Sequence, residues 1–87
     1  MTMGRPKVVH RREAHDVFIG RPSKWGNPYV IGRDGDRQTV INKYVGYLHA
    51  RPDLLLAIPE LHGKTLGCFC SPLPCHGDVL ADLAELI

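Results

Sequence analysis

Hydrophobic residues follow two different spacings along this chain of 87 residues. In the first third they come in short runs bounded by glycine and proline, which is typical of β-strands. Such runs cover residues 7–10, 16–19 and 29–31. A fourth run at residues 64–70 has no clear polar face, as expected for a central strand that is buried on both sides. We therefore predict three or four short strands.

The remaining hydrophobic residues recur at helical spacing. The first predicted helix begins after Asp34 or Asp36, either of which can cap it, and ends just before Pro52. A second, shorter helix follows Pro52, and a third begins near His76, Gly77 or Asp78 and runs to the C-terminus. The order strand, strand, loop, helix, helix, strand, helix predicts an α/β fold. We expect a small sandwich with a partly parallel sheet of three or four strands and about three helices.

Length and composition indicate one small domain over residues 1–87. Hydrophobic content of 44% and charged content of 23% are ordinary for a globular protein and exclude a disordered or fibrous class. The longest apolar stretch, at residues 54–58, is too short to cross a membrane. The chain begins without the pattern of a secretory signal, and three cysteines cannot form a closed disulfide framework. We therefore expect a cytoplasmic protein.

The charge of the chain is unevenly distributed. Residues 1–33 carry seven basic and two acidic residues, a net charge of +5, whereas residues 34–87 carry four basic and seven acidic residues, a net charge of −3. A basic N-terminal part attracts phosphate groups, either on a small molecule or on a nucleic acid. The alternative explanation is an ordinary solvent-exposed charged surface that binds no partner.

All three cysteines lie within residues 68–76, a segment that ends in a histidine. Cys68 and Cys70 are two residues apart on a predicted strand, so their sulfurs should lie on one face of it. The turn at residues 71–74 can bring Cys75 and His76 back over the end of that strand. Cys68, Cys70, Cys75 and His76 are therefore a candidate zinc site. Their spacing is not that of common zinc fingers, and zinc is the less favoured of the interpretations.

The same segment also suits thiol chemistry. Cys75 is predicted at the start of the last helix, where the helix N-terminus should lower the pKa of the thiol and make it a better nucleophile. His76 can serve as a base, and these two residues are the candidate catalytic groups. Asp78 can cap the helix or leave its N–H groups for a phosphate, and the cap is favoured. Cys68 and Cys70 are explained as well by simple burial in the core.

A second candidate segment, residues 20–28, combines glycines, basic residues and a tryptophan. Glycine permits close approach of a ligand to the backbone, basic side chains attract phosphate, and the indole ring can stack on a base. The alternative is a rigid loop whose Trp25 fills part of the core. The candidate ligand-binding residues of the chain are Arg21, Lys24, Trp25, Gly26, Asn27 and Asp78.

Three motifs in this order resemble a known family. They are Val-Val-His-Arg-Arg at residues 8–12, Gly-Arg-Pro-Ser-Lys-Trp-Gly-Asn-Pro at residues 20–28, and the run from Gly67 to Asp78 with its Cys-Phe-Cys and Pro-Cys-His-Gly-Asp sequences. Together they resemble domain of unknown function 4326, a small bacterial and bacteriophage domain, over residues 8–85. The resemblance implies that the segments at residues 20–28 and 68–78 belong to one domain, and that the setting is the cytoplasm of a bacterium or of a phage host. It implies no activity.

Two hypotheses about function follow from these features. The first is a domain that binds a nucleotide, a nucleoside or another phosphate-bearing ligand at the strand ends, with or without catalysis. The second is a phage or bacterial interaction module that binds a host protein, with the cysteine and histidine cluster as a structural element. Binding of nucleic acid through the basic first third is a further possibility with less support, and we expect no membrane partner.

Overall fold

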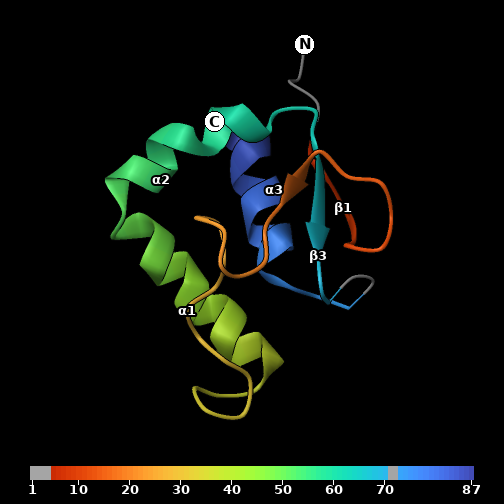
Figure 1. Cartoon of the computed structure of the whole chain (residues 1–87). Helices are drawn as coiled ribbons and strands as arrows, with labels where there is room; N and C mark the ends of the chain where they lie inside the picture. Colours follow the sequence, from red (N-terminus) through yellow and green to blue (C-terminus); the bar gives the residue numbers. More distant parts are fainter. Residues whose placement is uncertain (1–4, 71–72) are drawn as a thin grey trace.

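A computed structural model describes residues 5–70 and 73–87 of the chain (Figure 1). Its elements, in chain order, are β1 (Lys7–His10), β2 (Val17–Phe18), α1 (Arg37–His49), α2 (Pro52–Ala57), the 3-10 helix η1 (Ile58–Leu61), β3 (Thr65–Cys68) and α3 (His76–Leu86). The predicted α/β class, with three strands and three α-helices in the described residues, is confirmed. Within these residues, no helix has both the length and the apolar character needed to span a membrane.

The three strands form one sheet in the order β1-β3-β2, and both outer strands run parallel to β3. The sheet is therefore fully parallel rather than partly parallel. Gly67 of β3 is opposite Val9 on one side and Phe18 on the other, so the strand predicted to be central is central. Because the strands are parallel, their carboxyl ends lie at the same edge of the sheet (Figure 1).

The helices begin and end where local signals place them. The Asp36 side chain accepts a hydrogen bond from the backbone N–H of Thr39 at 2.8 Å and caps α1, and Pro52 opens α2. Pro59 has no N–H to continue α2, so that helix ends at Ala57 and a 3-10 turn follows. The C-terminal helix begins at His76 as predicted.

One predicted strand is wrong. Residues 29–31 form bends and a turn instead of pairing with the sheet. Asp34 closes this turn, because its carboxylate accepts a hydrogen bond from Val30 N–H at 2.8 Å and its own N–H donates to the Val30 carbonyl at 2.8 Å. The side chains of Tyr29 and Ile31 consequently face a cavity rather than a neighbouring strand. A run of three apolar residues fits a strand as well as it fits a turn that lines a cavity, so the sequence alone did not distinguish the two.

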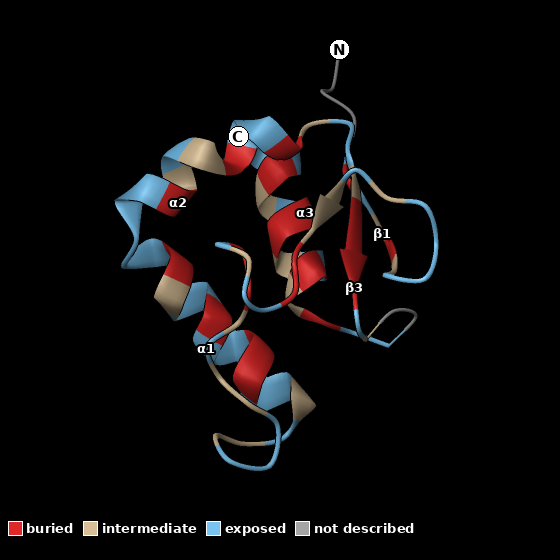
Figure 2. Cartoon of the chain, in the orientation of Figure 1, coloured by how far each residue is buried: buried red, intermediate tan, exposed pale blue. Residues whose placement is uncertain are grey.

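A single core joins the helices to the sheet. The helix α3 packs against β1, η1 and α1, and Figure 2 shows the buried faces of α1 and α3 turned toward the interior. Trp25 from the loop after β2 enters this core and is only 2% exposed. The Tyr44 hydroxyl donates a hydrogen bond to the Trp25 carbonyl at 2.6 Å, which fixes that loop to α1. Residues 20–28 are thus held rigidly beside the edge where β2 and β3 end.

Candidate functional site

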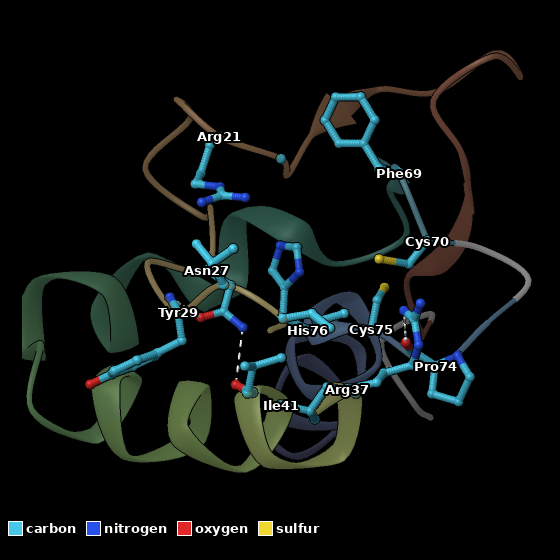
Figure 3. A pocket seen from close by; sticks show the side chains of 14 residues that line it. Arg21, Asn27, Tyr29, Arg37, Ile41, Phe69, Cys70, Pro74, Cys75 and His76 are labelled. Carbon is cyan, nitrogen blue, oxygen red and sulfur yellow. Dashed lines mark hydrogen bonds between the residues drawn. The ribbon is translucent and has the colours of Figure 1, made fainter. Parts of the chain in front are cut away.

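A cavity of about 250 Å³ lies at the carboxyl ends of β2 and β3 (Figure 3). Its wall is built by the loop after β2, the first turns of α1, the segment after β3 and the start of α3. The lining residues are Gly20, Arg21, Asn27, Tyr29, Val30, Ile31, Arg37, Val40, Ile41, Phe69, Cys70, Pro74, Cys75 and His76. Open α/β sheets bind ligands at this edge, so the cavity is the candidate functional site.

Two arginines give the cavity a positive charge. Arg21 follows β2, and Arg37 is the first residue of α1, where its Nη1 donates a hydrogen bond to the Pro74 carbonyl at 3.1 Å. Figure 3 shows their guanidinium groups on either side of the His76 ring. Among the described lining residues there is no aspartate or glutamate. The cavity therefore favours anions.

His76 is the first residue of α3 and lies half-buried in the cavity wall. Its Nε2 is 2.7 Å from the carbonyl oxygen of Ile19, and the edge of its ring contacts Tyr44 with the ring centroids 4.9 Å apart. Burial lowers the pKa of His76, and the positive charge of Arg21 lowers it further. Both effects favour the neutral form of the imidazole.

Cys75, one of the two candidate catalytic groups, caps α3. Its sulfur accepts a hydrogen bond from Gly77 N–H at 3.3 Å, while Cys75 N–H donates to the Asp78 carboxylate at 3.0 Å, which completes a capping box. The same sulfur is 3.3 Å from the buried sulfur of Cys68. The contact with Cys68 and burial both raise the pKa of Cys75. This direction is opposite to the one expected from the position of Cys75 at a helix N-terminus.

Comparison with known proteins identifies the family. The sequence matches domain of unknown function DUF4326 over residues 5–86. The chain belongs to the DUF4326 family. This confirms the resemblance carried by the motifs at residues 8–12, 20–28 and 67–78.

Two viral proteins are similar to this DUF4326 domain. "Uncharacterized protein R718" of Acanthamoeba polyphaga mimivirus is 39% identical over 90 residues, which covers 83% of this chain and 68% of that protein. "Uncharacterized 12.4 kDa protein in nrdA-td intergenic region" of Enterobacteria phage T4 is 34% identical over 85 residues, covering 91% of this chain and 77% of that protein. No solved structure shows a significant match to the chain. Proteins similar to this DUF4326 domain therefore occur in a giant virus and in a bacteriophage.

The four candidate zinc ligands of the DUF4326 domain do not converge. Cys68 lies in the core, whereas Cys70 lies beyond the end of β3 and lines the cavity. Cys75 contacts Cys68, but the Nε2 of His76 points to the Ile19 carbonyl. Across residues 5–70 and 73–87, no group of three or more histidine, cysteine, aspartate or glutamate side chains has an arrangement that could hold a metal ion. Part of the predicted turn at residues 71–74 lies outside the described residues, since it includes residues 71 and 72.

The loop at residues 20–28 contributes only part of the predicted site. Arg21 and Asn27 line the cavity, but both amide atoms of Asn27 are bonded internally, to Tyr29 N–H at 2.9 Å and to the Val40 carbonyl at 3.0 Å. Trp25 is buried in the core, as the alternative interpretation proposed.

The other predicted residues serve structural contacts. Lys24 forms an exposed ion pair with Glu60 at 3.1 Å and does not line the cavity. Gly26 packs against Arg21, because a Cβ at Gly26 would lie 2.9 Å from the Arg21 Cγ atom. Asp78 is the helix cap described above, which confirms the favoured interpretation.

Several lining residues were not predicted from the sequence. Phe69 and Tyr29 form apolar parts of the wall, and Arg37 reaches it from α1. One signal for Arg37 was available, because a cation in the first turn of a helix opposes the helix dipole. A cation at such an unfavourable position is a candidate for ligand binding. Phe69 and Tyr29 gave no comparable signal.

Proposed function

We propose that this DUF4326 domain binds a small phosphate-bearing ligand of about mononucleotide size in the cavity at the carboxyl edge of the sheet. The observation that carries the proposal is the pair of guanidinium groups in a wall whose described residues include no carboxylate. Arginine binds phosphate through hydrogen bonds assisted by charge, and its planar group can donate two of them at once.

The remainder of the cavity suits a ring. Tyr29, Ile41 and Phe69 supply apolar and aromatic surface beside the arginines. Cavities that bind drug-sized ligands usually have volumes of about 300–1,000 Å³, and this one, at about 250 Å³, is slightly smaller. A mononucleotide, or one end of a larger ligand, fits that size better than a dinucleotide does.

Calorimetric titration with nucleoside monophosphates, nucleosides and inorganic phosphate tests the proposal. A single hydrogen bond to a charged group contributes about 1.5–3 kcal/mol, so Arg21→Gln should weaken binding of a nucleoside monophosphate by about 10-fold or more. Arg12→Gln is the matched control, because Arg12 is exposed and does not line the cavity. Absence of binding of every phosphate-bearing compound to the wild-type protein would refute the proposal.

A second candidate is a module that binds a host protein. The rim of the cavity supports it, because Phe69 is 55% exposed and Ile31 is 48% exposed. Large exposed apolar side chains at a cavity rim are typical of protein contacts. If this candidate is correct, Phe69→Ser should abolish association with the partner, whereas Leu56→Ser should not, because Leu56 is exposed but does not line the cavity.

A further inference from the structure

The orientation of the His76 ring is fixed by the chain itself. A backbone carbonyl can only accept a hydrogen bond, so the 2.7 Å contact between Nε2 and the Ile19 oxygen requires a proton on Nε2. The edge contact with Tyr44 holds the ring from α1. In the neutral form of the ring, the other nitrogen, Nδ1, carries a lone pair and acts as an acceptor.

No group in the described residues uses this acceptor. The Ile19 carbonyl is the hydrogen-bond partner of the His76 side chain, and it is bound by Nε2. Figure 3 shows the ring inside the cavity between the two arginines. Arg21 and Arg37 can only donate hydrogen bonds, and the amide of Asn27 is already bonded at both ends. Nδ1 is thus an acceptor in a cavity whose charged groups are all donors.

We propose that Nδ1 of His76 determines specificity by accepting a hydrogen bond from a hydroxyl or amino group of the ligand whose phosphate the two arginines bind. The inference rests on the proposed function and refines it, because it divides phosphate-bearing compounds into two classes. A phosphate ester that carries a suitably placed hydroxyl or amino group satisfies both Nδ1 and the arginines. A phosphate ester without such a group, or inorganic sulfate, which carries no proton at neutral pH, satisfies the arginines alone and leaves Nδ1 without a partner.

The tautomer can be tested without any ligand. Long-range ¹H–¹⁵N correlation spectra of the imidazole groups distinguish a proton on Nε2 from a proton on Nδ1. We expect His76 to be neutral with its proton on Nε2 at pH 7. A proton on Nδ1, or a charged ring at that pH, would overturn the inference whatever the cavity binds.

The selective role is tested with adenosine 5′-monophosphate and inorganic sulfate, which has no hydrogen-bond donor at neutral pH, as the two probes. We expect the wild-type protein to bind the monophosphate ester at least 10-fold more tightly. His76→Leu has no acceptor in place of Nδ1, so it should remove most of this preference and leave sulfate binding within about 2-fold. His49→Leu is the matched control, because His49 is exposed on α1 and does not line the cavity.

The outcomes separate this inference from the proposed function. Equal affinities for the two probes, or an unchanged preference in His76→Leu, would overturn the role of His76 while leaving the anion site in place. Absence of binding of either probe would overturn both. The spectroscopic test uses the wild-type protein, so it decides the tautomer even if the variant fails to fold.

Discussion

At the scale of single residues, the three cysteines differ sharply in their surroundings. Cys68 and Cys75 are buried with their sulfurs 3.3 Å apart, whereas Cys70 is half-buried in the cavity wall. Only the thiolate reacts quickly, and the pKa of Cys75 is raised. The catalytic role first considered for Cys75 is therefore disfavoured by its own environment.

Thiol labelling tests this difference. With an aromatic disulfide reagent at pH 7.5, we expect one thiol per chain to react rapidly in the folded protein and all three to react after denaturation. The rapid thiol should be absent in Cys70→Ser, because Cys70 is the most accessible of the three. Rapid labelling of Cys75 in the folded protein would show that it is activated after all.

His76 should make the protein less stable in mild acid. Burial lowers its pKa in the folded state below the ordinary value of 6.5, so below about pH 6.5 the unfolded chain binds a proton that the folded chain excludes. The free energy of unfolding must then fall as the pH decreases from 7 through this window, with the full contribution present above it. Urea titrations at pH 5.5 and 7.5 measure the fall, and it should be smaller in His76→Gln. An equal fall in both proteins would contradict the assignment.

At the scale of elements, the ends of the helices were predictable and the pairing of strands was less so. Asp36, Pro52 and Asp78 act on backbone groups a few residues away, so the sequence contains the whole signal. Strand pairing depends on distant segments, and residues 29–31 therefore looked like a strand although they form a turn. The site follows the same rule. Arg21 was predicted because it is a basic residue in a segment that also holds glycines and a tryptophan, whereas Phe69 belongs to the wall only because of tertiary packing.

Two helical glycines should respond oppositely to alanine. Gly46 lies on the exposed face of α1, and a Cβ there would meet no described atom within 4 Å. Since alanine is a better helix former, Gly46→Ala should stabilise the protein by about 0.5–1 kcal/mol. The measurement is the free energy of unfolding in urea.

Gly77→Ala is the matched comparison in α3. A Cβ at Gly77 would lie 2.8 Å from Ile19 Cδ1 and 3.0 Å from Val8 Cγ1, where the helix approaches the sheet. Ile19 is fully buried and has little room to move. Overpacking of a core costs about 1–3 kcal/mol, which exceeds the gain in helix propensity. A stabilised Gly77→Ala protein would show that α3 is packed more loosely than the structure indicates.

At the scale of the whole molecule, the fold partly neutralises the basic N-terminal part of the chain. Arg5 pairs with Asp82 at 2.7 Å and with Glu85 at 2.8 Å, both on α3, and Lys24 pairs with Glu60 at 3.1 Å. The net charge of +5 in residues 1–33 is therefore not presented as one surface. This weakens the case for nucleic-acid binding.

Binding of single-stranded oligonucleotides should consequently depend little on salt. If the two cavity arginines are the phosphate contacts, the slope of log K against log salt concentration should be about −1.4, since each contact contributes about −0.7 on a single strand. Fluorescence anisotropy of a labelled oligonucleotide, titrated at salt concentrations from about 50 to about 200 mM, measures this slope. A slope steeper than about −4 would require a larger basic surface and would favour nucleic acid as the partner.

The cavity wall should unfold together with the rest of the molecule. Trp25 is the single tryptophan of the chain and is 2% exposed, and its carbonyl oxygen accepts a hydrogen bond from the Tyr44 hydroxyl at 2.6 Å. Its fluorescence therefore reports on the loop that holds Arg21 and Asn27, while far-ultraviolet circular dichroism reports on the helices. The two signals should give one midpoint in urea with a slope of about 1 kcal/mol per M, the value for small proteins. A fluorescence transition at a lower urea concentration than the circular dichroism transition would mean that the loop unfolds separately. The two arginines would then be brought together by ligand binding instead of being preorganised in the free protein.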